Sequence, residues 1–292
     1  MYSSAMGNIE SSVVSNAASS PSDIPEGNGI FFAGIPLPHE TLRYIFSYVP
    51  ARDLIVSATR VCKYWNDLLS ETHFWLYKLQ VDGIDLPEAT RVKLTQDASF
   101  SKGLDILRMI CSGHIPLGKN LLKNPSGAES FSHWNIVHGG DGLIVESPPV
   151  GSDPIPEEAE LPTQHCFVSS YGFCSRKQVI HLQSLRLTSV VLNKLKPKFI
   201  ISEWVSARWD CRSQSRLIVD FIGRKSTKTI NLDWSSDDDD VVQRHWYEVK
   251  KTVTDYPADL YKIVYTNVSK DRQFWAGHFG AKTAGSSVKL LL

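Results

Sequence analysis

The apolar residues of this chain follow two different periods, and the change of period near Lys119 limits the chain to a two-part fold. Before this point, one stripe has the helical spacing i, i+3, i+4, i+7: Leu42, Ile45, Phe46 and Val49. After it, short segments alternate apolar and polar residues, as in RLIVDFIG (216–223), which is typical of strands that bury one face. We therefore predict an α+β protein of two modules, helical and then antiparallel β-sandwich.

Composition and turn signals divide the chain into four segments. Residues 1–33 are rich in Ser, Asn, Ala and Gly, so we expect a disordered tail. Residues 34–80 are expected to form three helices, residues 81–118 a helical linker, and residues 119–292 an antiparallel β-sandwich. Within the helical module, Pro50 ends the first helix, and a second stripe follows at steps of four and three: Leu54, Ala58, Val61, Trp65 and Leu68.

The charge and cysteine content exclude several classes of protein. The 292 residues carry 31 basic and 31 acidic side chains, which disfavours a duplex-nucleic-acid binder or a polybasic membrane anchor. The chain has no apolar stretch of membrane-spanning length and no secretory leader pattern. Its five cysteines are scattered and contain no C-x-x-C pair, as expected in a reducing compartment. We therefore expect a cytoplasmic protein that does not insert into membranes.

The helical module carries more apolar surface than so small a core can hide. The excess could pack on the linker and the sandwich, or it could bind a partner protein. The segment LPHETLRYIFSYVPARDLIVSATRVCKYWNDLLSETHFWLYKL (37–79) resembles an F-box. The resemblance implies binding to a Skp-type adaptor and, through it, to a cullin–RING scaffold. The adaptor contacts that it implies are Leu37, Pro38, Leu42, Ile45, Phe46, Val49, Leu54, Val61 and Trp65.

The β module resembles the F-box-associated domain of the sugar-recognising F-box family. The similar blocks are NLLKNPSGAESFSHWNIVHGGDG (120–142), SSYGFCSRKQVIHLQ (169–183), SEWVSARWD (202–210) and FWAGHFGAKTAGSSV (274–288). The family fold is a jelly-roll-like β-sandwich. Its glycan-binding members hold the inner chitobiose of high-mannose N-glycans on misfolded glycoproteins in the cytosol, so glycoprotein clients are the implied partners.

Carried over from the family, the implied glycan-binding residues are Tyr171, Asp210, Phe274 and Trp275. Exposed aromatic rings suit the apolar face of a sugar, and a carboxylate accepts hydrogen bonds from its hydroxyls. The alternative is that one ring of the Phe274-Trp275 pair is core and the other covers the end of the sandwich. The chain departs from the family pattern at five positions. Ala276 replaces a lysine, His278 and Leu143 each replace a tryptophan, Phe274 replaces a tyrosine, and Tyr171 stands where a phenylalanine is usual.

Other motifs favour no catalytic or metal chemistry. Asp237–Asp240 lacks the spacing of a calcium loop, and His133 and His138 have no ligand partners at metal spacing. The Asn267-Val268-Ser269 sequon is expected to be unused. We therefore expect a non-catalytic receptor subunit of a ubiquitin ligase without metal or cofactor. Two alternatives remain: the same ligase role with a protein degron in place of the glycan, and a carbohydrate-active enzyme with paired carboxylates.

Overall fold

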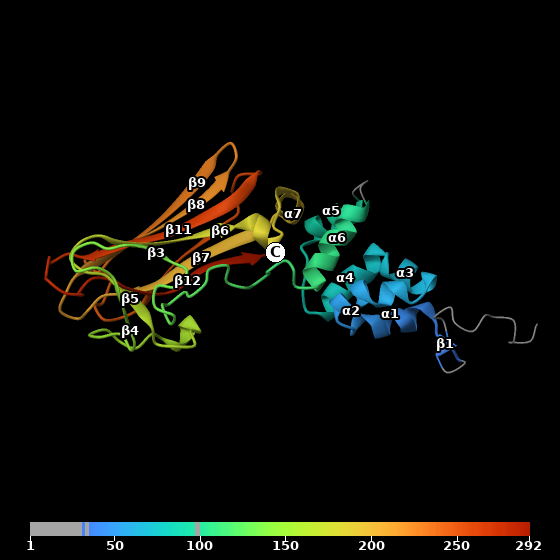
Figure 1. Cartoon of the computed structure of the whole chain (residues 1–292), viewed down its shortest axis with the longest axis horizontal. Helices are drawn as coiled ribbons and strands as arrows, with labels where there is room; N and C mark the ends of the chain where they lie inside the picture. The colour runs from blue at the N-terminus through green and yellow to red at the C-terminus, as the bar shows by residue number, and fades with distance from the viewer. Residues whose placement is uncertain (1–30, 33–34, 97–99) are drawn as a thin grey trace, which may run out of the picture.

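The structure is a computed structural model that describes residues 31–32, 35–96 and 100–292. Figure 1 shows helices gathered at one end of the molecule and a β-sandwich at the other. The predicted disordered tail, residues 1–33, lies outside the described residues except for Phe31 and Phe32. These two form β1 (Phe31–Phe32), which pairs with β2 (Ile35–Pro36).

The helical end contains the helices of residues 34–80, which are more numerous than the three expected, and two helices of the linker. Proline stands at the N-terminal boundary of both α1 and α2, where its missing N–H costs nothing. The helices are α1 (His39–Ser47), α2 (Ala51–Val56), η2 (Ala58–Arg60), α3 (Lys63–Leu69), α4 (Thr72–Val81), α5 (Glu88–Gln96) and α6 (Phe100–Cys111).

The second apolar stripe does not lie on one continuous helix. The chain leaves α2 after Val56, passes through η2, and becomes extended at Cys62, where φ is −158°. The Cys62 sulfur then accepts the backbone N–H of Trp65 at 3.5 Å and begins α3. A local side-chain acceptor of this kind satisfies a free N–H at the start of a helix. Apolar periodicity continues through the break because Leu54, Ala58 and Leu68 are all buried.

The linker helix α6 covers part of the apolar surface that seemed excessive for the helical module. Trp75 of α4 is fully buried, and its indole N–H donates to the Leu69 carbonyl at 2.7 Å. Arg108 of α6 donates to the same carbonyl at 2.9 Å and lies 5.6 Å from the Trp75 ring centre. The linker therefore helps to bury Trp75, whereas Ile45 and Val61 stay exposed.

The sandwich consists of two five-stranded antiparallel sheets, which confirms the predicted fold class. Their strand orders are β10-β7-β12-β5-β4 and β3-β6-β11-β8-β9. Leu217, Val219 and Phe221 point into the core, as the alternation predicted. The strands are β3 (Asn135–Val137), β4 (Ile144–Glu146), β5 (Cys166–Val168), β6 (Cys174–His181), β7 (Lys198–Ser206), β8 (Ser213–Gly223), β9 (Thr227–Ser235), β10 (Tyr247–Val253), β11 (Leu260–Asp271) and β12 (Lys282–Leu291).

The two modules share a continuous apolar core rather than meeting across a loose linker. Three short helices lie in the connections between the strands of the sandwich: η3 (Glu157–Ala159), η4 (Leu182–Leu185) and α7 (Ser189–Leu195). Figure 1 shows α7 between the sandwich and α5, and the Thr90 hydroxyl donates to the Leu195 carbonyl at 3.4 Å. Leu117 of the linker also bridges to Leu290 of β12. These contacts fix which end of the sandwich faces the helices and which end is free.

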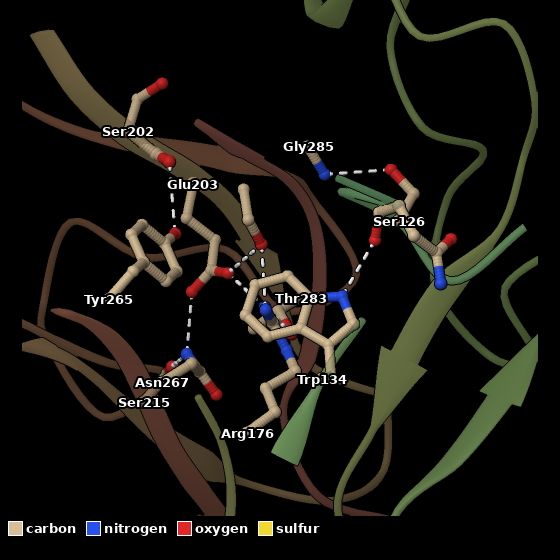
Figure 2. A network of polar contacts seen from close by, with 12 residues as sticks. Ser126, Trp134, Arg176, Ser202, Glu203, Ser215, Tyr265, Asn267, Thr283 and Gly285 are labelled. Atoms are coloured by element: carbon tan, nitrogen blue, oxygen red, sulfur yellow. Dashed lines mark hydrogen bonds and ion pairs between the residues drawn. The ribbon is translucent and has the colours of Figure 1, made fainter. Parts of the chain in front are cut away.

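A buried polar network joins the two sheets (Figure 2). Arg176 of β6 forms an ion pair with Glu203 of β7, and both side chains are almost completely excluded from solvent. The guanidinium also donates to Ser286 at 2.9 Å and Thr283 at 3.0 Å, while the other oxygen of Glu203 accepts from Asn267 at 2.6 Å. The sequon asparagine is therefore a core residue, and its amide nitrogen is engaged in the folded chain.

Candidate ligand-binding site at the tip of the sandwich

The loops at the free end of the sandwich hold all four predicted glycan-binding residues. Strand register shows why: Lys282 at the start of β12 pairs with Val168 at the end of β5 and with Ser206 at the end of β7. The loops that follow β5, β7 and β11 must therefore emerge together. They carry Tyr171, Asp210 and the Phe274-Trp275 pair respectively, at the end of the sandwich away from the helices (Figure 1).

One buried carboxylate orients the aromatic pair. Asp271, at the end of β11, accepts the backbone N–H of Phe274 at 2.8 Å and that of Trp275 at 3.0 Å, one on each oxygen. Phe274 takes a left-handed backbone with φ of +60°, which redirects the chain. Phe274 is 75% exposed and Trp275 is 42% exposed. Both rings face outward, and neither is a core residue.

Tyr171 and Phe274 are brought into contact from different loops. Their ring centres lie 4.9 Å apart at 65°, an edge-to-face arrangement. Gly140 and Gly172 allow the neighbouring loops to approach, because a Cβ on Gly172 would come within 2.3 Å of the Gly140 nitrogen. Asp141, in the loop between β3 and β4, accepts the N–H of Gly277, in the loop between β11 and β12, at 2.5 Å. The aromatic surface is therefore built on loops that constrain one another.

Asp210 lies on the adjoining loop but is not a free carboxylate. Arg208 holds both oxygens, at 2.9 Å from Nε and 3.1 Å from Nη2. This hydrogen bonding lowers the pKa of Asp210 below its ordinary value. Arg208 also lies 4.8 Å from the Phe279 ring centre, and Phe279 packs edge-on against Trp275 at 5.9 Å. Asp210 thus joins the aromatic surface through Arg208 and Phe279 rather than by touching it.

Two comparisons of the whole sequence decide the family. Residues 36–78 match the family described as F-box-like, and residues 113–290 match the F-box associated region. F-box only protein 27 of Mus musculus is 31% identical over 258 residues, which cover 86% of this chain and 89% of that protein.

This chain is an F-box protein with an F-box associated region. F-box only protein 17 of Homo sapiens is 28% identical, covering 87% of this chain and 91% of its own. F-box only protein 2 of Bos taurus is 29% identical over a match that covers 92% of this chain and 86% of that protein. Among solved structures, TmCBM61 in complex with beta-1,4-galactotriose aligns with 60% of this chain and 99% of its own, at 12% identity and a TM-score of 0.37. That alignment has no bearing on what this F-box protein binds.

The nine predicted adaptor contacts fall into two groups according to their burial in this chain. Leu42, Phe46 and Leu54 are buried in the core of this chain, where they support the helices from within. The other six keep solvent-accessible surface: Leu37, Pro38, Ile45, Val49, Val61 and Trp65. Four further apolar or aromatic side chains of this region are exposed and were not predicted as contacts: Ile35, Tyr44, Tyr48 and Val56. The surface left for a partner is therefore larger than the motif implied.

The tip of this F-box protein includes aromatic residues that sequence reasoning missed. Trp209 is 60% exposed, and its backbone N–H is fixed by the Gly151 carbonyl at 2.9 Å. Phe173, two residues after Tyr171, is exposed beneath the Lys270 ammonium, which lies 4.6 Å from the ring centre. Trp209 directly precedes the predicted Asp210, and Phe173 follows the predicted Tyr171 after one glycine. Their position just outside a strand end was the signal that could have identified them.

Two buried thiols of the sandwich are kept in their protonated form. Burial raises the pKa of the Cys166 and Cys211 thiols to about 12, so both are protonated at neutral pH. Over residues 35–96 and 100–292, His, Cys, Asp and Glu do not gather in threes as metal ligands would. Within the same part of the chain, no helix has the length and apolarity that crossing a membrane requires.

Proposed function

We propose that this F-box protein is the substrate-recognition subunit of an SCF-type ubiquitin ligase. The exposed F-box residues bind a Skp-type adaptor, which links the chain to a cullin–RING scaffold. The tip loops bind the chitobiose core of high-mannose N-glycans on misfolded glycoproteins in the cytoplasm, which are then ubiquitinated and degraded. Membership of the family supports the ligase role. The chain itself acts as a non-catalytic receptor.

The observation that carries the glycan proposal is the outward-facing aromatic surface of Tyr171, Phe274 and Trp275 on mutually constrained loops. A pyranose ring has an apolar C–H face that packs on such rings at little cost in side-chain entropy. Its hydroxyl rim needs donors and acceptors, and the Arg208–Asp210 pair presents both beside the rings. An exposed aromatic surface with a charged pair near its edge suits a neutral sugar.

Ala276 sets the expected strength of this binding. A lysine at that position would add a charged donor, worth about 1.5–3 kcal/mol when well placed. Without it, chitobiose should bind more than tenfold more weakly than to a site that has the lysine. Replacing Ala276 by lysine should therefore strengthen binding, which calorimetric titration of the full chain with chitobiose measures.

Removal of the rings provides the decisive test. Trp275→Ala and Phe274→Ala should each reduce chitobiose affinity at least tenfold, because each deletes part of the stacking surface. Val137→Ala, an exposed apolar residue on β3, is the matched control and should bind like the unchanged chain. Chitobiose binding that survives loss of both rings would refute the glycan site.

A protein degron is the second candidate ligand for the same loops, favoured by Ala276 and by the additional exposed Trp209. A glycan array separates the two: a folded chain that binds the adaptor but no high-mannose glycan leaves only the degron. The carbohydrate-active enzyme is disfavoured because Asp210 is paired with Arg208 and its pKa is lowered. A general acid requires a carboxyl with a raised pKa. Hydrolysis of a chromogenic glycoside would reverse this conclusion.

A further inference from the structure

The outermost strand of one sheet, β9, leaves an open edge at the margin of the sandwich (Figure 1). The other three edges of the two sheets are shorter or better protected. β3 and β4 have three residues each, and the seven-residue β10 carries Lys250 and Lys251, which discourage strand addition. β9 has nine residues, no proline and one lysine, Lys228, whose ammonium lies 3.1 Å from Asp255. Among the sandwich edges that the structure describes, β9 is therefore the one most open to pairing.

The open edge presents a regular row of backbone groups. At the two ends of the β8–β9 ladder, the Gly223 N–H donates to Ser226 at 2.8 Å and the Ser236 N–H donates to Ser213 at 3.0 Å. Bonded and non-bonded pairs alternate in an antiparallel ladder, and this ladder has no register shift. The even-numbered residues from 228 to 234 therefore bond to β8. The odd-numbered ones direct their N–H and C=O groups away from it, and all four are exposed: Thr227, Thr229, Asn231 and Asp233.

The charges around β9 are divided between its two ends. The turn before the strand carries Arg224 and Lys225, and the turn after it carries Asp238, Asp239 and Asp240. All five residues are exposed, and within the described part of the chain none of their side chains has an ion-pair partner. A strand with a basic beginning and an acidic end attracts a copy of itself only if the two copies run antiparallel. In a parallel pair, like charges would meet at both ends.

We propose that β9 pairs with β9 of a second copy of this chain, antiparallel and about a two-fold axis at Ile230. Thr229 then lies opposite the partner's Asn231, and Thr227 lies opposite the partner's Asp233. This register uses every outward-directed backbone group from 227 to 233, and each copy presents the same surface to the other. The inference does not rest on the proposed function, because it uses neither the tip residues nor the exposed F-box residues.

The side chains suit this register as well as the backbone does. On the outer face, threonine meets aspartate or asparagine, which are pairs that can share hydrogen bonds. On the face toward the other sheet, Ile230 meets the partner's Ile230 and Lys228 meets the partner's Leu232, so like charges are not opposed. At each end, the Arg224-Lys225 turn of one copy comes beside the Asp238–Asp240 turn of the other. An unrelated extended peptide has no reason to carry this order of charges, so the surface selects a second copy.

Sedimentation velocity of the full chain over a range of concentrations tests the pairing. We expect a reversible monomer–dimer equilibrium that higher ionic strength shifts toward the monomer, because salt screens the charged ends. Asn231→Pro should raise the dissociation constant of the dimer at least about tenfold, because both copies lose an outward N–H. Asn231→Ala keeps that N–H and is the matched control, which should associate nearly as well as the unchanged chain. The thermal midpoint of each variant shows whether its fold is intact.

A charge exchange tests the antiparallel order without relying on proline. One chain carries Arg224→Glu with Lys225→Glu, and the other carries Asp238→Lys with Asp239→Lys. Each chain alone should associate at least about tenfold more weakly than the unchanged chain, because like charges now meet at both ends. A mixture of the two should form heterodimers, since opposite charges meet again at both ends. A change in folding alone would not restore association on mixing.

Four outcomes would overturn the proposal. The first is an unchanged chain that stays monomeric at every concentration. The second is association that Asn231→Pro leaves intact. The third is a failure of the two charge-exchanged chains to pair on mixing while the unchanged chain dimerises. The fourth is a monomeric chain that instead binds an extended peptide of alternating Thr and Val, which would assign this edge to a different occupant.

Discussion

At the C-terminal end of β11, the side chain of Asp271 turns back into the loop that follows and accepts two of its N–H groups. The residue is almost fully buried, whereas the two residues it holds are the exposed aromatics. The orientation of the rings thus depends on a residue that no ligand would touch. Sequence reasoning identified the rings and overlooked the carboxylate, because an aspartate at a strand end is usually a solvated turn residue.

Asp271→Ala should lower the free energy of unfolding by about 1–3 kcal/mol, because two loop N–H groups lose their acceptor. It should also weaken chitobiose binding, since the rings are no longer held outward. Urea unfolding and calorimetric titration measure the two effects. Asp239→Ala, in an exposed turn, should change neither. Unchanged binding in a destabilised Asp271→Ala chain would show that the rings need no such support.

The Arg208–Asp210 pair makes stability depend on pH in a defined direction. The folded pKa of Asp210 lies below the unfolded value of about 3.9, so the charged pair stabilises the fold above that pH. This contribution is lost as the pH falls through the folded pKa. The difference in unfolding free energy between the unchanged chain and Asp210→Asn should stay constant from about pH 7 to pH 5 and shrink below about pH 4. A difference that grows on acidification would contradict this assignment.

At the scale of elements, apolar spacing predicted the helices and strands, but not the interruption between α2 and α3. Periodicity records which residues are buried, and burial continues through the break because Leu54 and Leu68 enter the same core. The break itself depends on the Cys62 sulfur accepting one N–H, which composition does not show. The same limitation applies to the tip: the family resemblance indicated which residues share a site, while side-chain pairing such as Arg208 with Asp210 needed coordinates.

The separation of F-box residues into buried and exposed groups leads to a sharp test of adaptor binding. Ile45→Asp combined with Val61→Asp should abolish capture of a Skp-type adaptor in a pull-down, because it places charges on exposed apolar surface. The thermal midpoint should change little, since neither side chain belongs to the core. Val137→Asp, an equally exposed valine on the sandwich, is the control. Full adaptor capture by the double variant would exclude this surface as the interface.

Over the whole molecule, the two sheets are joined by polar as well as apolar contacts, and the helices share the same core. Arg176 lies against the rings of both Trp134 and Phe167, at 4.6 Å and 4.3 Å from their centres, while it pairs with Glu203. A buried pair of this kind stabilises little in net terms, but removal of one member leaves an uncompensated charge. The sequence offered no sign of this pair, because inward-facing Arg and Glu interrupt the alternation from which the core was predicted.

Glu203→Ala should therefore lower the free energy of unfolding by about 3–5 kcal/mol. The double variant Arg176→Met with Glu203→Ala should recover part of that loss. Asp233→Ala breaks the exposed pair with Arg216 and should cost at most about 1 kcal/mol. Because the core is continuous, helix content and tryptophan fluorescence should report one common unfolding transition. Equal losses for Glu203→Ala and Asp233→Ala would show that burial does not matter here.

The buried position of Asn267 has a practical consequence for how the chain can be produced. Oligosaccharyltransferases act on nascent polypeptide, before β6 and β8 have closed around β11. A sugar attached at that stage would occupy the place where the amide meets Glu203 and Ser215, and the two sheets could not come together. In synthesis through a secretory route, glycosylation of Asn267 would therefore compete with folding. Asn267→Gln would remove the glycosylation acceptor, but its longer side chain would crowd the same interior space.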